Sequence, residues 1–189
     1  HSLPVMQIAT FTTKWTILRL MMSEQRQTAE TSRWPLPDSG QRTVIPPAVL
    51  SRVSQHPLCA GCMPHGVGFY PQAHGHRMAR QQPADDLLIY CVAGAGEVTY
   101  GDQSQPVEAG ELLLFPAGLP HRYQAAPQQP WSIYWVHLGG HEVQAYFDEI
   151  AGQPQSGIRK VNVGVHSRLA EDFQALMAAA TNAQPEHLM

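Results

Sequence analysis

Three histidines in this chain have the residue type and spacing that could hold a metal ion. His74 and His76 are one residue apart, and His121 follows an apolar segment later in the chain. Two imidazoles at positions i and i+2 of a strand lie on one face, so with His121 they could supply three nitrogen ligands. Arg80 comes soon after His76, and its guanidinium cannot ligate a cation and repels one nearby. The pattern favours His74 and His76 in a solvated loop and a hydrogen-bonded His121, with metal binding as the alternative.

A second cluster, Cys59, Cys62 and His65, has C-x2-C-x2-H spacing. A structural zinc site needs a fourth ligand and usually a second close pair, so we do not expect zinc here. The chain has 3 cysteines, which cannot all pair with one another, and this favours a reducing compartment and a cytoplasmic location. No nucleophile elbow and no phosphate-binding glycine loop occurs in the sequence. We therefore predict no cofactor and no catalytic residue.

Composition limits the class of protein. The chain has 189 residues, of which 43% are hydrophobic and 14% charged, and this predicts one folded domain with appendages. The 12 basic and 15 acidic residues give a net charge of −3, so the chain lacks the basic excess that binding to nucleic-acid phosphates needs. No apolar run reaches the length of a membrane span. We expect neither nucleic acid nor a membrane as a direct partner of these residues.

The middle of the chain has the pattern of an antiparallel β protein. Between Val67 and Leu138, short apolar runs alternate with Gly and Pro turn residues, a spacing typical of sandwiches and barrels. The predicted strands are residues 67–70, 87–92, 97–100, 112–115, a short strand around Tyr123, and 132–138. Residues 1–55 lack such periodicity and are rich in Thr, Gln, Ser and Pro, which predicts a flexible arm.

Helical periodicity begins after Gly140. Val143, Phe147 and Ile150 share one face of a predicted helix that ends near Gly152. A second predicted helix carries an apolar stripe made of Leu169, Phe173, Leu176, Met177 and Ala180. Such a stripe is buried either against the outside of a barrel or in a contact between two copies of the chain. The pattern alone does not choose between them.

Three segments resemble a known family. The segment from Gly110 to His121 has the form G-x5-P-x-G-x2-H, which resembles the second motif of the cupin β-barrels. The segment 86–96 precedes it, and a strand of the form P-W-x3-W-V-H-x2-G, residues 130–140, follows it. Together they resemble the effector-binding and dimerisation domain of the AraC family of bacterial transcription regulators. The resemblance extends from about residue 56 to the second predicted helix.

This resemblance implies a mainly β fold, in which a cupin-like barrel (a double-stranded β-helix or jelly roll) is followed by two α-helices. Residues 56–140 would form the effector-binding barrel, and residues 141–189 a helical dimerisation segment, after the arm at residues 1–55. In the family the arm responds to the effector, and the two helices make a homodimer contact. The dimer-interface residues that the resemblance implies are Leu169, Phe173, Leu176 and Met177.

The resemblance also implies a set of ligand-binding residues. Tyr123 and Trp135 match aromatic positions of the family's sugar pocket, and aromatic faces stack on sugars and on other flat ligands. Ile133 stands where that pocket has a histidine, which argues against arabinose as the effector. Arg80 lies near the position of a pocket arginine, and His121 completes the predicted ligand-binding set.

These features together predict a ligand-sensing, homodimerising domain that is not an enzyme, with a small-molecule effector such as a sugar. In the family, DNA is bound by helix-turn-helix units C-terminal to the barrel, and we expect contact with DNA only through such a domain of the parent protein, beyond this chain. One alternative is a metal-dependent cupin enzyme, an isomerase or dioxygenase, that uses His74, His76 and His121. The other is a structural barrel without a ligand.

Overall fold

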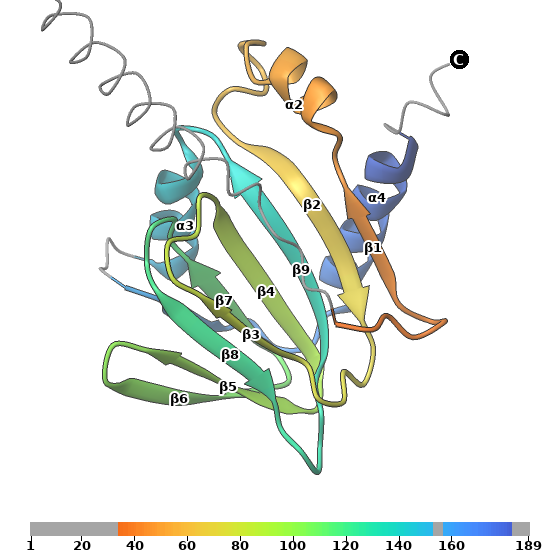
Figure 1. Cartoon of the computed structure of the whole chain (residues 1–189), viewed down its shortest axis with the longest axis vertical. Helices are drawn as coiled ribbons and strands as arrows, with labels where there is room; N and C mark the ends of the chain where they lie inside the picture. The colour runs from red at the N-terminus through yellow and green to blue at the C-terminus, as the bar shows by residue number, and fades with distance from the viewer. Residues whose placement is uncertain (1–33, 153–156, 183–189) are drawn as a thin grey trace, which may run out of the picture. The chain divides into compact units, whose positions relative to one another are not determined.

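The chain folds into two antiparallel β-sheets that enclose one interior (Figure 1). The computed structural model describes residues 34–152 and 157–182. The strand order of the larger sheet is β1 (Gln41–Val44), β2 (Met63–Tyr70), β9 (Ser132–Gly139), β4 (Asp86–Ala93), β7 (Glu111–Phe115) and β10 (Arg159–Asn162). The order of the smaller sheet is β3 (Arg77–Arg80), β8 (His121–Ala125), β5 (Ala95–Tyr100) and β6 (Gln103–Glu108). This mainly β, cupin-like architecture confirms the predicted fold class.

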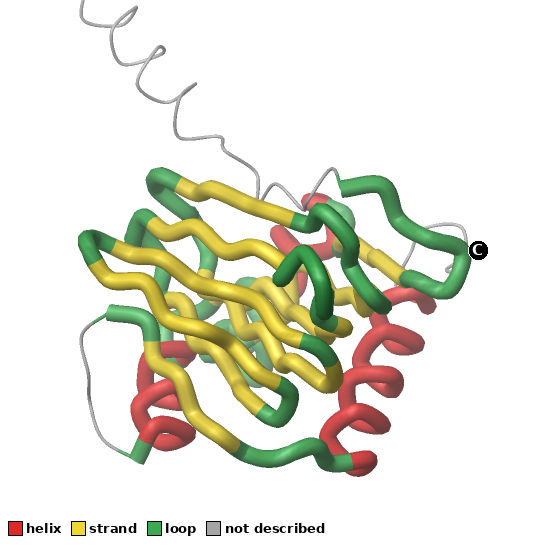
Figure 2. Tube along the Cα trace, turned by 90° about the horizontal axis from the view of Figure 1, so that it is seen from below, coloured by secondary structure: helices red, strands yellow, loops and turns green. Residues whose placement is uncertain are grey.

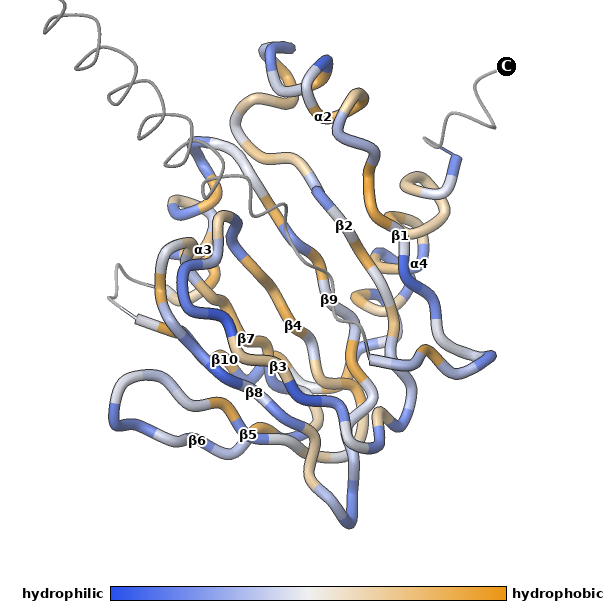
Figure 3. The backbone as a smooth tube through the Cα atoms, in the orientation of Figure 1, coloured by the Kyte–Doolittle hydropathy of each residue, from blue (hydrophilic) through white to orange (hydrophobic). Residues whose placement is uncertain are grey.

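Alternation along the strands separates the interior from the outer face. In β4, Leu87 and Ile89 point between the sheets, whereas Tyr90 points away from them. Strands β7 and β9 alternate in the same way, and apolar side chains from both sheets fill the interior. Because β4 is covered on both faces, it reads as a nearly continuous apolar run, which Figure 3 shows as hydrophobic colour along the strand.

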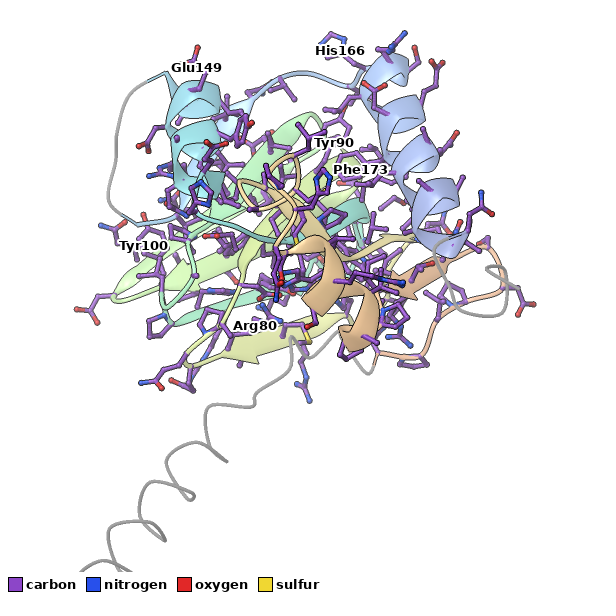
Figure 4. The ribbon with its side chains drawn as sticks, turned by 90° about the horizontal axis from the view of Figure 1, so that it is seen from above. Arg80, Tyr90, Tyr100, Glu149, His166 and Phe173 are labelled. Atoms are coloured by element: carbon purple, nitrogen blue, oxygen red, sulfur yellow. The ribbon has the colours of Figure 1, made fainter. Side chains whose placement is uncertain are left out.

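Two helices cover the outer face of the larger sheet. Helices α3 (Val143–Ala151) and α4 (Ser167–Asn182) lie on the same side of the strands (Figure 2) and share one buried cluster with them. In that cluster the ring of Phe173 stacks on Tyr134 with 5.1 Å between centroids, and on Tyr90 with 6.3 Å. Figure 4 shows Tyr90 and Phe173 together beside α4. As predicted, α3 ends at Gly152, whose φ of 78° is the left-handed conformation that favours glycine.

The apolar stripe of α4 is used mainly within the chain. Phe173, Met177 and Ala180 are buried against the sheet, while Leu169 and Leu176 are half-buried. The outer face of the larger sheet is apolar and needs a cover, and α4 supplies it. Phe173 and Met177 are therefore used in packing within the chain, and their assignment to a contact between two copies stays a prediction.

Five short elements were not predicted, among them β3 and β6 of the smaller sheet. Strand β1 and helix α2 (Pro47–Val53) lie within the segment assigned to the arm, and β10 lies within the segment expected to be helical. β1 pairs with β2 and β10 pairs with β7, so these two strands form the edges of the larger sheet. Residues 1–33 of the predicted arm and residues 183–189 of the C-terminal segment lie outside the described residues.

The smaller sheet ends at strand β6. The hairpin between β5 and β6 turns at Gly101, where the sequence predicted a reversal and where φ is 54°. Pro106 lies opposite Glu97 in this hairpin, and its carbonyl oxygen accepts a hydrogen bond of 2.9 Å from Lys160 Nζ. The same ammonium group lies 2.9 Å from a carboxylate oxygen of Glu111. Lys160 thereby links the edge of the smaller sheet to the larger one.

Candidate functional site

The interior between the sheets has an aromatic end and an ionic end. At the aromatic end, the ring centroid of His76 lies 5.1 Å from that of Tyr70 and 6.0 Å from that of Trp131. At the ionic end, Arg80 lies opposite His121 in the pairing of β3 with β8. His76 directly precedes β3 and Arg80 ends it, so this strand connects the two ends.

His76 is buried and its protonation is fixed by one hydrogen bond. The indole nitrogen of Trp131 donates to His76 Nδ1 at 3.2 Å. Burial lowers the pKa of His76 to about 4, so the ring is neutral near pH 7. Because Nδ1 accepts a hydrogen bond and the ring is neutral, its proton lies on Nε2. His76 Nε2 is buried and has no hydrogen-bond partner among the described residues.

His121 is buried in the opposite tautomer. Its Nδ1 lies 2.8 Å from the carbonyl oxygen of Leu119, which only accepts, so Nδ1 carries the proton. Burial is the main reason that the pKa of His121 is lowered to about 4, so this ring too is neutral near pH 7. His121 Nε2 is therefore an acceptor. It is buried and finds no partner within the part of the chain that the structure describes.

Of the predicted aromatic residues, Tyr123 lies between these histidines and Trp135 lies beside Tyr70. The ring of Tyr123 is 5.8 Å from His76 and 6.0 Å from His121, measured between centroids, and burial raises the pKa of its hydroxyl. The ring of Trp135 is 5.5 Å from that of Tyr70. A Cβ at position 68 would come within 2.6 Å of the Trp135 indole, so Gly68 makes room for it. The indole N–H of Trp135 is buried and unpartnered among residues 34–152 and 157–182.

The ionic end contains a closely packed trio. Arg80 Nη1 donates to Asp85 Oδ1 at 3.0 Å, and His137 Nδ1 lies 3.0 Å from Asp85 Oδ2. Burial raises the pKa of Asp85, but the hydrogen bonds and charges of His137 and Arg80 outweigh it and lower the pKa overall. The ring of His137 lies 5.4 Å from that of Trp135, so the trio borders the aromatic wall.

One side chain of the predicted arm reaches the aromatic end. The ring of Trp34 lies 5.1 Å from Tyr70 and 5.4 Å from His76, measured between centroids. Its indole nitrogen donates to the carbonyl oxygen of His74 at 2.9 Å. Trp34 therefore covers this end of the interior.

The structure brings the predicted ligand-binding residues together. Tyr123, Ile133 and Trp135 belong to the interior cluster, His121 is buried beside it, and Arg80 lies at the ionic end. Four further residues lie in the interior without having been predicted from the sequence: Asp85, His137, Tyr70 and Trp131. The alternation in β9 was a usable signal for His137, because it lies two residues after Trp135 and therefore faces the same side.

The histidine pattern with which the sequence analysis began does not form one site. His74 is exposed, whereas His76 is 2% and His121 is 3% exposed. The prediction of a solvated loop holds for His74 and is wrong for His76, because the turn before β3 directs that ring into the interior. Among the described residues, no group of three or more His, Cys, Asp or Glu side chains is arranged to hold a metal ion.

Two surface hollows lie near these residues. The larger, about 520 Å³, lies over the outer face of the smaller sheet and is bordered by outward side chains such as Arg77, Glu97 and Arg122. The smaller, about 260 Å³, is bordered by Arg80, Tyr100, Pro120 and His121. The second of these two is bordered by His121, whose buried Nε2 has no partner among the described residues. We therefore place the candidate site in the interior rather than on the outer face.

The sequence and the fold were compared with those of known proteins. A family model described as the AraC-like ligand binding domain matches residues 64–188. The chain is 36% identical over 153 residues to the MmsAB operon regulatory protein of Pseudomonas aeruginosa, which covers 79% of this chain and 49% of that protein. It is 24% identical over 83 residues to the lactose operon transcription activator of Staphylococcus xylosus, over 40% of this chain and 30% of that protein.

The chain thus spans about half the length of the first of these relatives and less of the second. Among solved structures, a cupin 2 conserved barrel domain protein from Salinispora arenicola matches with a TM-score of 0.40 and 17% identity, over 64% of this chain and 94% of that chain. Within the described residues, no helix is both long and apolar enough to cross a membrane.

Proposed function

Because this chain belongs to the family of AraC-like ligand-binding domains, we propose that it senses a small-molecule effector for a bacterial transcription regulator. The relatives described above are named as an operon regulatory protein and a transcription activator, which supports a regulatory role rather than an enzymatic one. The effector, such as a sugar, binds in the interior of the barrel, in the cytoplasm. DNA is bound by another domain of the parent protein.

The observation that carries this proposal is a set of buried nitrogens that the chain itself does not satisfy. They are His76 Nε2, His121 Nε2 and Trp135 Nε1, all buried and without a hydrogen-bond partner among the described residues. Leaving a buried polar group unpaired costs about 1 to 3 kcal/mol, so a barrel that served stability alone would carry apolar side chains there. A ligand that pairs with these nitrogens explains why they are present.

Regulation requires that the effector bind two arrangements of the protein unequally. Trp34 supports the arm as the element that changes, since it packs on Tyr70 and His76 at the aromatic end. An effector that contacts the same rings would alter the affinity of the arm for the barrel. A coupling of about 1 to 3 kcal/mol is typical of such regulation.

Dimerisation through the helices belongs to the same proposal. Leu169 and Leu176 of α4 are half-buried, and Tyr146 and Ile150 of α3 are exposed large side chains. These four remain available for a contact with a second copy after Phe173 has been used within the chain.

The test is an effector screen on the full chain. Small metabolites, sugars included, are added to the purified protein, and stabilisation is read as a rise in melting temperature. A compound that binds in the barrel should bind about tenfold more weakly to Tyr123→Leu, which removes the ring that lies between the two histidines. The matched change Tyr146→Leu, on the exposed face of α3, should leave its affinity unchanged. Equal weakening by both variants, or by neither, would place binding outside the barrel.

A further inference from the structure

The unpartnered nitrogens of the interior have fixed hydrogen-bonding roles. His76 accepts from Trp131 at Nδ1 and therefore offers an N–H at Nε2. His121 donates to Leu119 at Nδ1 and therefore offers a lone pair at Nε2. Trp135 offers its indole N–H, which can only donate. The wall of the interior thus presents two donors and one acceptor.

These three groups are connected by contacts with two aromatic rings, Tyr123 and Tyr70. The ring of Tyr123 is flanked by His76 and His121, and the ring of Tyr70 is flanked by His76 and Trp135. All three side chains are more than nine-tenths buried, with exposed fractions of 2% for His76, 3% for His121 and 4% for Trp135. The two donors come from the larger sheet and from the turn before β3, and the acceptor comes from β8.

The charges of the interior are balanced without a ligand. Arg80 and Asp85 are paired at 3.0 Å at the ionic end, with His137 on the second oxygen of the carboxylate. Near pH 7 the rings of His76 and His121 are uncharged, because burial lowers the pKa of each to about 4. A carboxylate ligand would have to compete with Asp85 for Arg80, and an ammonium ligand would meet the N–H groups of His76 and Trp135. Burying either charge without a free counter-charge is costly.

We propose that the effector is an uncharged small molecule that carries at least one oxygen acceptor, such as a carbonyl or hydroxyl, for the His76 and Trp135 N–H groups, and a hydroxyl donor for His121 Nε2. This inference rests on the proposed function and specifies its ligand.

Three matched probes test the ligand class on the full chain. Acetoin carries a carbonyl and a hydroxyl without charge. Lactate has nearly the same shape with a carboxylate in place of the acetyl group, and butanone keeps the carbonyl but lacks the hydroxyl. The readout is the NMR signal of the Trp135 indole N–H, assigned by its disappearance in Trp135→Phe. Acetoin should move this signal saturably, and lactate and butanone should bind at least about three- to tenfold more weakly.

The variant His121→Phe removes the acceptor and keeps a ring of similar size. It should weaken the binding of acetoin by about three- to tenfold, because the acetoin hydroxyl loses its acceptor. The affinity for butanone should stay unchanged, because butanone has no hydroxyl. Ile133→Val, an apolar change in the same interior, should weaken both probes equally. Equal effects of His121→Phe on acetoin and butanone would overturn the assignment of the acceptor.

The outcomes separate this inference from the proposed function. Lactate binding as tightly as acetoin, or more tightly, would overturn the uncharged class while the barrel remained a ligand site. If neither acetoin nor lactate moves the Trp135 signal, the inference is contradicted. The metabolite screen then decides the proposed function on its own. The tautomers are checked independently from the NMR signals of the ring nitrogens at pH 7, where protons on Nδ1 of His76 or Nε2 of His121 would overturn the donor and acceptor pattern.

Discussion

At the scale of single residues, the buried histidines make stability depend on pH. His76 and His121 are neutral in the folded chain because charging them would place an uncompensated cation between aromatic rings. Each gives one ring nitrogen to the protein and leaves the other for a ligand. The buried neutral rings that could bind a ligand are therefore also the groups whose protonation at low pH destabilises the fold.

We predict that the free energy of unfolding falls as the pH is lowered from 6.5 to 4. In the unfolded chain a histidine takes up a proton below its ordinary pKa of 6.5, whereas folded His76 and His121 take it up only near their lowered pKa of about 4. Between these values the unfolded state binds more protons, so acid favours unfolding. The loss is roughly 3 kcal/mol for each histidine, since one pKa unit corresponds to about 1.4 kcal/mol. Urea unfolding across this pH range measures it.

The matched variants are His121→Asn and His141→Asn. Asparagine at position 121 can still donate to the Leu119 carbonyl but does not titrate, so part of the acid sensitivity should disappear. His141 is exposed on the surface, and its replacement should leave the acid sensitivity of the wild type. A wild-type slope in His121→Asn would show that the acid sensitivity arises elsewhere.

A second prediction at this scale concerns the ionic end. Asp85→Asn removes the counter-charge of Arg80 and should lower the free energy of unfolding by about 3 kcal/mol, because a buried charge loses its partner. The exposed pair Arg168 and Asp172, with 3.2 Å between Nε and Oδ1, provides the control. Asp172→Asn should change stability by less than about 0.5 kcal/mol. Comparable losses in urea unfolding from both variants would contradict a special role for the buried pair.

At the scale of secondary-structure elements, strands with a strong apolar pattern could be predicted. β4, β7 and β9 were found because their side chains are apolar on two faces or alternate regularly. β1 and β10 are short polar strands, and their conformation is set by pairing with β2 and β7, which no local pattern encodes.

Local sequence patterns also limited how much of the candidate site could be predicted. Tyr123 and Trp135 were found through a resemblance to a family whose pocket they match. The position of His76 depends on a turn whose hydrogen bonds run to distant strands: Ala73 N–H donates to the Trp131 carbonyl at 2.8 Å, and Ala125 N–H donates to the His76 carbonyl at 2.8 Å. Sequence spacing places His74 and His76 on one face only if both lie in a strand, and β3 begins after them.

The prediction at this scale concerns α4. Phe173→Ala should lower the free energy of unfolding by about 3 to 5 kcal/mol, because the ring is buried between Tyr90 and Tyr134 and its removal leaves a cavity. Glu171→Ala, on the exposed side of the same helix, should change it by less than about 0.5 kcal/mol. Urea unfolding distinguishes them, and a Phe173→Ala protein of wild-type stability would mean that α4 does not cover the sheet in solution.

At the scale of the whole molecule, Asp86, the first residue of β4, and Asp85 before it connect the interior to the helical layer. Asp85 faces Arg80 and His137, whereas Asp86 accepts hydrogen bonds from Ala117 N–H, at 2.8 Å, and from the side chain of Gln144 in α3. A change at the ionic end therefore lies one residue from a contact that positions α3. This continuity supports a link between effector binding and the helices of the proposed dimer.

The prediction at this scale concerns that dimer. Leu176→Asp should convert dimers to monomers that keep the circular dichroism spectrum of the wild type, because Leu176 is half-buried and lies beside the cover of the sheet. Phe173→Asp should unfold the chain instead, since its ring is in the core. Sedimentation equilibrium with Glu171→Lys as a control measures the change. A Leu176→Asp protein that remains dimeric would place the contact elsewhere, and Tyr146 on α3 would be the next position to test.

The outer strand of the smaller sheet also limits how this protein aggregates. An exposed sheet edge is a template onto which another chain can add a strand, the first step toward amyloid-like fibres. At Pro106 the edge has no N–H to donate, and its carbonyl oxygen is already held by Lys160. A strand arriving at β6 would therefore miss a donor and displace an ammonium group at the same point. The edge strand β6 is in this way protected from polymerisation at Pro106.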